Sequence, residues 1–137
     1  MKAGLAISPN TPASSVTDEM GNAADLLLVM TVHPGRGGQK FMPNCLTKVE
    51  ELRQRFPTKN IQVDGGVGAG NACQCAKAGE SLASEAPDSK ADELGSNVLV
   101  AGTAIFGSKD PKQTISAMRS QVDGALEENE KGQNGSA

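Results

Sequence analysis

The sequence has few of the residues that build large cores and metal sites. It has no Trp or Tyr, and aromatic residues make up 2% of its 137 positions. A core must therefore be assembled from Leu, Ile, Val, Ala and Met, and we expect it to be modest. His33 is the only histidine, so it has no second histidine with which to form a metal-binding pair. We interpret His33 as a solvated loop residue rather than a ligand.

Disulfides, basic charge and long apolar runs are also missing. The chain has three cysteines, Cys45, Cys73 and Cys75, and an odd number does not suit a disulfide framework. Their spacing is not that of a zinc site, so we interpret them as structural thiols in a reducing compartment. The net charge of −3 offers no basic field for nucleic acid or an anionic membrane. The longest apolar run, Leu26–Met30, is far shorter than the roughly 20 residues that span a bilayer. Since Met1–Ser8 also lacks the long apolar segment of a signal peptide, we expect a cytoplasmic protein.

Short apolar runs recur along the chain and predict four strands. They are Gly4–Ile7, Leu26–Val32, Ile61–Val63 and Val98–Ala101. The second and fourth runs do not alternate with polar residues, which is typical of strands covered on both faces in a parallel sheet.

Helical patterns alternate with these runs. We expect helices over Asn44–Phe56, where Pro57 ends the helix, over Asn71–Ala78, and from Pro111 onward. Apolar residues at spacings of three and four form one stripe on the first helix and one on the last: Leu46, Val49, Leu52 and Phe56; Ile115, Met118, Val122 and Leu126. Strand and helix in alternation predict an α/β fold of four βα units with a parallel sheet.

Two polar segments interrupt this order. Residues 80–95 are acidic and polar, and we interpret them as a surface insertion with one helical turn around Lys90–Leu94. A retained intron translated in frame is the other interpretation of this segment. Residues 127–137 are charged and then rich in Gly, Asn and Ser, which predicts a disordered tail. The folded part is therefore expected over residues 1–126.

Glycines are concentrated directly after three of the predicted strands. They are Gly35, Gly37 and Gly38 beside Arg36, then Gly65 and Gly66, then Gly102 beside Thr103. Ligands of parallel α/β sheets bind at the carboxyl ends of the strands, and glycine lets main-chain N–H groups approach an anion closely. Together these loops predict a phosphate cradle, although any single loop is equally compatible with a tight turn. The Arg36 side chain is compatible with a phosphate contact and with solvent.

Asp64 ends the third predicted strand and precedes two glycines. A carboxylate at this position points toward the site and can act as an acid or base or bind a metal. The alternative is a carboxylate that accepts hydrogen bonds within the turn.

Four blocks in this order resemble strands five to eight of ribulose-phosphate 3-epimerases. They are AGLAISPNTP at 3–12, LVMTVHPGRGGQKF at 28–41, VDGG at 63–66 and AGTAIFG at 101–107. The resemblance runs from residue 1 to about residue 122, apart from 80–95. It implies a (β/α)8 TIM barrel, of which this chain is the C-terminal half barrel.

The resemblance also implies a reaction and its residues. The family interconverts D-ribulose 5-phosphate and D-xylulose 5-phosphate by proton transfer between two Asp residues, with a divalent metal such as zinc, iron or manganese. Asp64 would be one acid/base and a metal ligand, and Met30 would line the site. The residues implied in substrate or phosphate binding are Gly35, Arg36, Gly37, Gly38, Gly65, Gly66, Gly102 and Thr103. Arg36 stands where the family usually has an aromatic residue.

The half that normally supplies the second Asp and other metal ligands has no counterpart in this sequence. We therefore expect the isolated chain to be inactive and to leave two strand edges unpaired. It is expected to form a homo-oligomer or to pair with a full-length or complementary barrel half. The alternative function is a non-catalytic product that binds phosphate or pairs with a partner. Family members often have Met before this Lys, so Met1 is also compatible with an internal codon of a longer frame.

Overall fold

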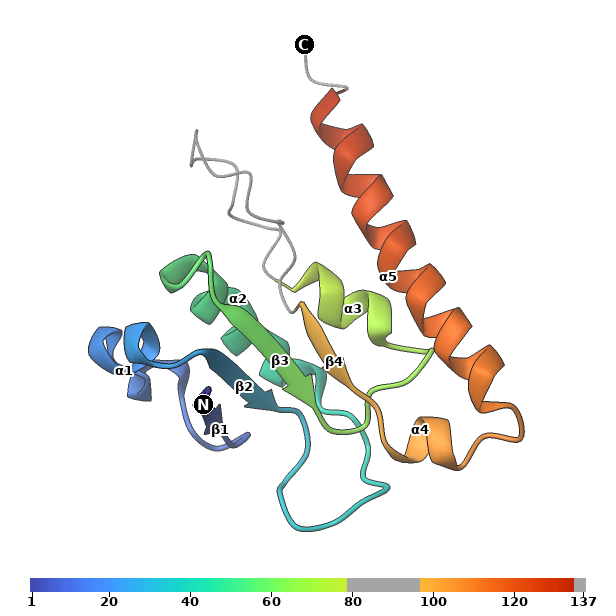
Figure 1. The fold of residues 1–137 in the computed structure, drawn as a ribbon, viewed down its shortest axis with the longest axis horizontal. Coiled ribbons are helices and arrows are strands. Elements are labelled where there is room, and N and C mark those ends of the chain that lie inside the picture. Colours follow the sequence, from blue (N-terminus) through green and yellow to red (C-terminus); the bar gives the residue numbers. More distant parts are fainter. Residues whose placement is uncertain (79–96, 135–137) are drawn as a thin grey trace.

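A computed structural model describes residues 1–78 and 97–134. Its four strands are β1 (Gly4–Ile7), β2 (Leu26–Met30), β3 (Asn60–Asp64) and β4 (Val98–Val100). They form one parallel sheet in the order β1-β2-β3-β4, so each strand lies beside the next one in the sequence (Figure 1). The predicted α/β class and the parallel sheet are confirmed, as part of a (β/α) barrel.

Helices follow the strands as the sequence predicts, with two additions. The helices are α1 (Asp18–Ala23), α2 (Leu46–Arg55), α3 (Ala72–Lys77), α4 (Thr103–Phe106) and α5 (Pro111–Asn134), with 3-10 turns η1 (Ala13–Ser15) and η2 (Pro43–Cys45). The sequence pattern does not predict α1 and α4, because both are too short to show an apolar period. The Thr17 hydroxyl, which accepts the Met20 amide at 3.2 Å, caps the start of α1.

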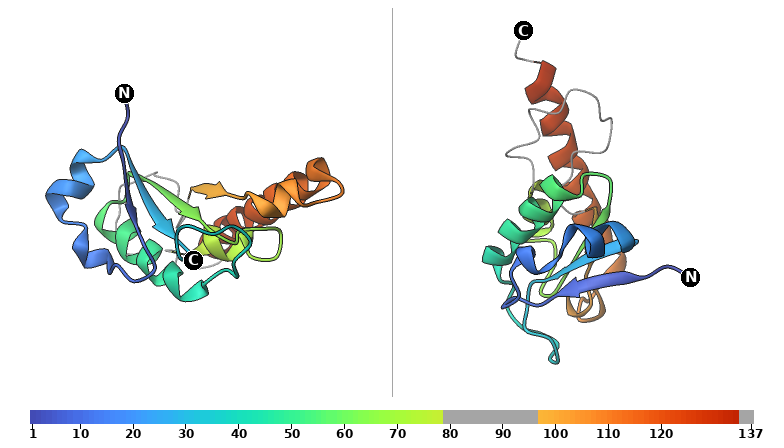
Figure 2. Two further views of the ribbon diagram at one scale, coloured as in Figure 1. Left: turned by 90° about the horizontal axis from the view of Figure 1, so that it is seen from below. Right: turned by 90° about the vertical axis from the view of Figure 1, so that its left-hand side faces the viewer.

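Among the described residues, helices cover only one face of the sheet. Leu27, Val29, Ile61 and Val63 are 0% exposed and belong to a core with side chains from α2, α3 and α5, which lie on one side of the sheet (Figure 2). The residues that alternate with them stay half-buried: Leu26, Leu28, Met30, Gln62, Asp64, Val98 and Val100. The prediction that β2 and β4 are covered on both faces is therefore wrong for this chain. The open face corresponds to the interior of a closed barrel, which four strands cannot enclose.

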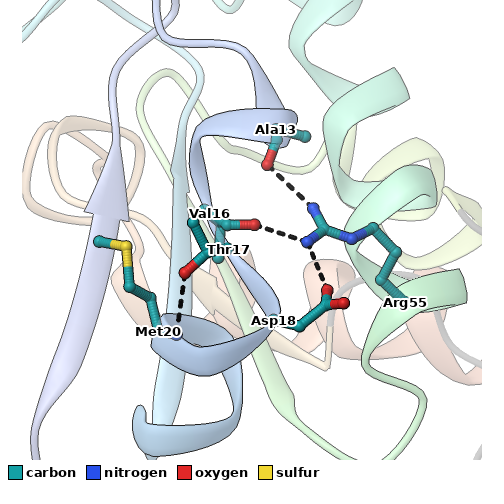
Figure 3. Close-up of polar contacts among 6 residues, drawn as sticks. All are labelled: Ala13, Val16, Thr17, Asp18, Met20 and Arg55. Atoms are coloured by element: carbon teal, nitrogen blue, oxygen red, sulfur yellow. Dashed lines mark hydrogen bonds and ion pairs between the residues drawn. The ribbon is translucent and has the colours of Figure 1, made fainter.

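Basic side chains of α2 hold the segment between β1 and β2 in place. Arg55 donates to the carbonyl oxygens of Ala13 and Val16 and pairs with the Asp18 carboxylate at 2.7 Å (Figure 3). The Lys48 ammonium donates to three carbonyl oxygens of the turn after β1, those of Ser8, Pro9 and Thr11, at 2.5–3.0 Å. These contacts attach the β1–α1 connection to the sheet through its main chain.

Helix α5 differs from its prediction at both ends. Met118 is buried as expected, but Ile115 is 40% exposed and lines an open groove together with Val98 and Leu99 of β4. The helix also continues to Asn134, whereas the sequence predicted disorder over 127–137. Glu, Lys and Gln in that segment are good helix formers, and the helix continues without a break from the packed turns before it.

The polar segment 80–95 and its helical turn at Lys90–Leu94 lie outside the described residues, as do residues 135–137. Within the described ranges, no helix is both long and apolar enough to cross a membrane.

The contact between α1 and Phe56 gives a stability prediction with an internal control. A methyl group on Gly21 would lie 2.2 Å from the Phe56 ring, whereas one on Gly124 in α5 meets nothing within 4 Å. We expect Gly124→Ala to stabilise the protein by about 0.5–1 kcal/mol through helix propensity. Gly21→Ala should instead destabilise it by about 1–3 kcal/mol, because the overpacked core must shift. Urea unfolding followed by circular dichroism measures both, and equal effects of the two substitutions would contradict this packing.

Candidate functional site

The glycine-rich loops after β2, β3 and β4 meet at the carboxyl edge of the sheet. A Cβ placed on Gly37 in the first loop would lie 3.9 Å from the Thr103 side chain in the third. A Cβ on Gly68, after β3, would lie 3.2 Å from that of Ala104 in α4. In Figure 1 the long loop after β2 extends past this edge beside α4. The structure thus brings the three predicted loops together.

The loop after β3 passes so close to the loop after β2 that two of its positions, Gly65 and Gly66, have no room for a side chain. Gly65 and Gly66 have φ angles of +126° and +67°, in the region that favours glycine. A methyl group on Gly66 would lie 2.6 Å from the Phe41 amide nitrogen, and one on Gly65 would lie 2.5 Å from a Val32 methyl. Both glycines are therefore required by the close approach of two main chains.

Thr31, directly after β2, joins these two loops. Its hydroxyl donates to the Gly65 carbonyl oxygen at 2.6 Å, and its amide donates to the Asp64 carbonyl oxygen at 2.8 Å. Its own carbonyl oxygen accepts from the Met42 amide at 2.9 Å. Thr31 is 0% exposed, and an unpaired hydroxyl in such a place would cost about 1–3 kcal/mol. These bonds fix the end of β3 relative to both ends of the loop after β2.

Gln39 closes the loop after β2 into a compact ring. Its side-chain amide donates to the carbonyl oxygens of His33 and Arg36, at 2.6 and 2.9 Å. The loop between them is exposed, and Gly35 and Gly38 both have positive φ angles. Arg36 is exposed at the tip, so its guanidinium is available to an anion that enters this edge.

Asp64 and Met30 are neighbours on the open face. They are paired in the β2–β3 register, and each follows a fully buried residue of its strand, so their side chains lie on the uncovered side. Both are half-buried. The predicted direction of the Asp64 side chain, away from the helix-covered core, agrees with this arrangement.

Gly102 and Thr103 begin the short helix α4. Both residues are exposed, and Gly102 is the N-cap of α4. Within the described part of the chain, the amides of Gly66, Gly102 and Thr103 donate to no main-chain or side-chain oxygen. These three N–H groups belong to the loops after β3 and β4, which meet at the carboxyl edge of the sheet. They remain available as donors to a ligand oxygen.

The side chains in the described part of the chain do not make a metal site. Among the described residues, no three His, Cys, Asp or Glu side chains are grouped closely enough to hold an ion. His33 is exposed, while Cys45 and Cys75 are buried on the helix side of the sheet and form no disulfide. Asp64 is therefore the one predicted metal ligand at this edge, and a metal centre would need ligands beyond those that the described residues bring together.

Sequence reasoning missed three residues that shape the site: Thr31, Gln39 and Lys48. Their roles come from contacts with main-chain carbonyl oxygens that are 3–40 residues away. No pattern of residue types in the sequence predicts contacts to main-chain carbonyl oxygens. The only signal was the position of Thr31 at the end of a buried run, where a hydroxyl needs a partner.

The fold and the site define an α/β protein of successive βα units with glycine loops gathered at the carboxyl edge. The chain belongs to the ribulose-phosphate 3 epimerase family, whose family model matches residues 1–106. It is 43% identical to a ribulose-phosphate 3-epimerase of Schizosaccharomyces pombe, over 89% of this chain and 46% of the relative. For the enzymes of that name from Candida glabrata and Escherichia coli the identities are 46% and 37%, over 43% and 48% of the relatives. The chain spans about half the length of the curated relatives it matches.

Two glycines with similar φ angles allow the cost of backbone strain to be measured apart from the cost of a steric clash between loops. Gly38 has a φ of +71°, and a methyl group placed on it would meet nothing within 4 Å. Gly66 has nearly the same φ but adjoins the Phe41 main chain. We expect Gly38→Ala to cost about 1–2 kcal/mol, the ordinary strain of a left-handed residue. Gly66→Ala should cost clearly more, because main chain must also move. Chemical denaturation measures both values, and equal costs would show that the two loops do not touch.

The thiols should differ in reactivity. Burial raises the pKa of the Cys75 thiol to about 12 and also raises the pKa of Cys45, whereas Cys73 is half-exposed. Since the thiolate is the reactive form, iodoacetamide should label Cys73 well before Cys45 and Cys75 in the folded protein. Peptide mass spectrometry measures the order, and urea-unfolded protein, in which the three rates should become similar, is the control. Early labelling of Cys75 would contradict its burial.

Proposed function

We propose that this chain carries the carboxyl-terminal half of a ribulose-phosphate 3-epimerase active site, which interconverts D-ribulose 5-phosphate and D-xylulose 5-phosphate. One observation carries the proposal. Asp64 ends β3 on the open face, and the glycine loops after β2, β3 and β4 meet at the same edge. A carboxylate beside an anion cradle is the arrangement that proton transfer on a phosphorylated sugar needs.

The roles follow from position and chemistry. Asp64 acts as one acid/base, and Met30 beside it keeps the reacting carbon away from water. The open amides of Gly66, Gly102 and Thr103 bind the phosphate, with Gly65 shaping the turn. The loop formed by Gly35, Arg36, Gly37 and Gly38 covers the substrate, and its arginine adds a positive charge beside the phosphate. Substrate binding in this half of the site thus depends mainly on main-chain N–H groups, with Asp64 as the reacting side chain.

Inversion at the reacting carbon needs an acid/base on each of its two faces, and Asp64 serves one face. The second carboxylate, together with further ligands for a divalent ion such as zinc, iron or manganese, must come from the half of the barrel that this chain does not contain. Asp64 would be one ligand of that ion. The chain alone is therefore expected to be inactive. A cytoplasmic location is part of the proposal, since one rice relative of the same name is described as a cytoplasmic isoform.

A complementation assay tests the function. The chain covers 46% of the Schizosaccharomyces pombe relative. It is mixed and refolded with the amino-terminal half of that relative, which would supply the first four strands of the barrel. We expect epimerase activity, and exchange of the C3 proton with deuterium from solvent, only in the mixture. Asp64→Asn should lower the restored rate by at least about 100-fold, as for loss of a general acid or base. Glu51→Gln, which removes an exposed carboxylate from α2, should leave the rate unchanged.

The outcomes separate the proposal from the alternative of a non-catalytic product. Binding of the sugar phosphate by the assembled halves without proton exchange would favour the alternative. A rate from the isolated chain, free of contaminating enzyme, would contradict the expected need for a second half. An active mixture in which Asp64→Asn is as fast as the original chain would rule out Asp64 as the acid/base.

A further inference from the structure

The loop after β2 is closed at two levels. At its base the Met42 amide donates to the Thr31 carbonyl oxygen at 2.9 Å, which joins the two ends of the loop through main chain. Farther out, the Gln39 side-chain amide donates to the carbonyl oxygens of His33 and Arg36 at 2.6 and 2.9 Å. In the described part of the chain, no other side chain of this outer part makes a hydrogen bond.

A side-chain amide suits the position of Gln39. Its nitrogen carries two hydrogens, so it can donate one to each of the two carbonyl oxygens. Gln39 is half-buried, whereas the residues from His33 to Gly38 are all exposed. The ring that these bonds close, residues 33–39, therefore has no buried side chain besides that of Gln39 to keep its shape.

The ring consists largely of residues that are flexible unless something holds them. Gly35 and Gly38 have φ angles of +105° and +71°, and glycine loses more conformational freedom on ordering than any other residue. Pro34 restricts only its own φ. Without the two bonds from Gln39, a ligand that contacts the ring would have to order it, and this ordering would weaken binding.

The ring lies against both of the other glycine loops (Figure 1). A methyl group on Gly66 would lie 3.1 Å from the main-chain oxygen of Gln39, and a Cβ on Gly37 would lie 3.9 Å from the Thr103 side chain. Gly66 and Thr103 carry two of the main-chain amides that make no hydrogen bond within the described residues. A ligand oxygen bound to these amides would therefore lie beside the ring.

We propose that Gln39 is a positioning residue for the loop that covers the substrate. Its two hydrogen bonds hold the ring in the covering shape before the substrate arrives, so that binding does not have to order the loop. The inference rests on the proposed function, because it requires a sugar phosphate at this edge. Asp64 is placed by the β2–β3 register and receives no bond from Gln39. Loss of Gln39 should therefore weaken substrate binding and leave proton transfer nearly unchanged.

Gln39→Met is the variant that isolates the two hydrogen bonds. Methionine has a similar length and no charge, but its thioether cannot donate. The matched control is Gln54→Met, the same change at an exposed position of α2. Urea unfolding followed by circular dichroism checks that both variants fold. If Gln39→Met does not fold, Gln39→Glu and its control Gln54→Glu are measured in place of the methionine pair.

Trypsin tests the ring in the chain alone, because Arg36 lies at its exposed tip. Cleavage after Arg36 requires the ring to open, and its rate follows the population of the open form. We expect Gln39→Met to raise this rate about tenfold, as for the loss of two hydrogen bonds, and Gln54→Met to leave it unchanged. Cleavage after Lys2, which is exposed near the first strand, is the internal reference and should be equal in all three proteins.

Kinetics test the consequence for the substrate. The chain and its variants are each assembled with the amino-terminal half of the Schizosaccharomyces pombe relative, as in the complementation assay. Gln39→Met should raise KM for D-ribulose 5-phosphate at least about fivefold and keep kcat within about twofold, the pattern of lost binding without lost chemistry. Gln54→Met should change neither constant. A residue that only stabilised the fold would not produce this division between KM and kcat.

The outcomes separate this inference from the proposed function. Equal cleavage after Arg36 in the unmodified chain and in Gln39→Met would show that Gln39 does not hold the ring. A lower kcat at constant KM, or no change in either, would overturn its role in substrate binding. An inactive mixture of the unmodified chain would contradict the proposed function and the substrate role with it. The trypsin result would still decide whether Gln39 holds the ring.

Discussion

Burial of a single face of the parallel sheet is the interaction on which the rest of this structure depends. The side chains of β2 and β3 on that face are fully buried against α2, α3 and α5, at about 25 cal/mol per Å² of apolar surface removed from water. The other face gains no such stabilisation from the described residues. With three Phe and no Trp or Tyr, the core has little apolar area to spare. Small losses of packing on the helix side therefore lower the free energy of unfolding by a large fraction of its total.

Because the core is one-sided, hydrogen bonds to main chain carry much of the loop structure. Thr31 links the ends of β2 and β3, Gln39 closes the loop between β2 and α2, and Arg55 holds the segment before α1. The candidate site at the carboxyl edge is thus made chiefly of backbone. Its few side chains, Asp64 and Met30 among them, are positioned by strand register rather than by partners of their own.

The sequence predicted what depends on local pattern. The four apolar runs became the four strands, the stripe through Val49 and Leu52 became α2, and Gly65 and Gly66 proved to lie where two loops touch. It did not predict what depends on distant contacts or on missing ones. An apolar run such as Leu26–Met30 predicts a strand, but it does not indicate whether one or both faces of that strand are covered. Whether that face is covered depends on elements outside the run itself, and the described residues leave it open.

The three carbonyl contacts of Lys48 have a consequence for sequence divergence. Every amino acid has a carbonyl oxygen, so the turn after β1 can exchange the side chains of Ser8, Pro9 and Thr11 and still offer the same acceptors. The ammonium has no such substitute, because a shorter or uncharged side chain would leave all three acceptors at once. Tolerance to substitution is therefore unequal across this contact: wide in the turn, and narrow at the one lysine that the turn surrounds.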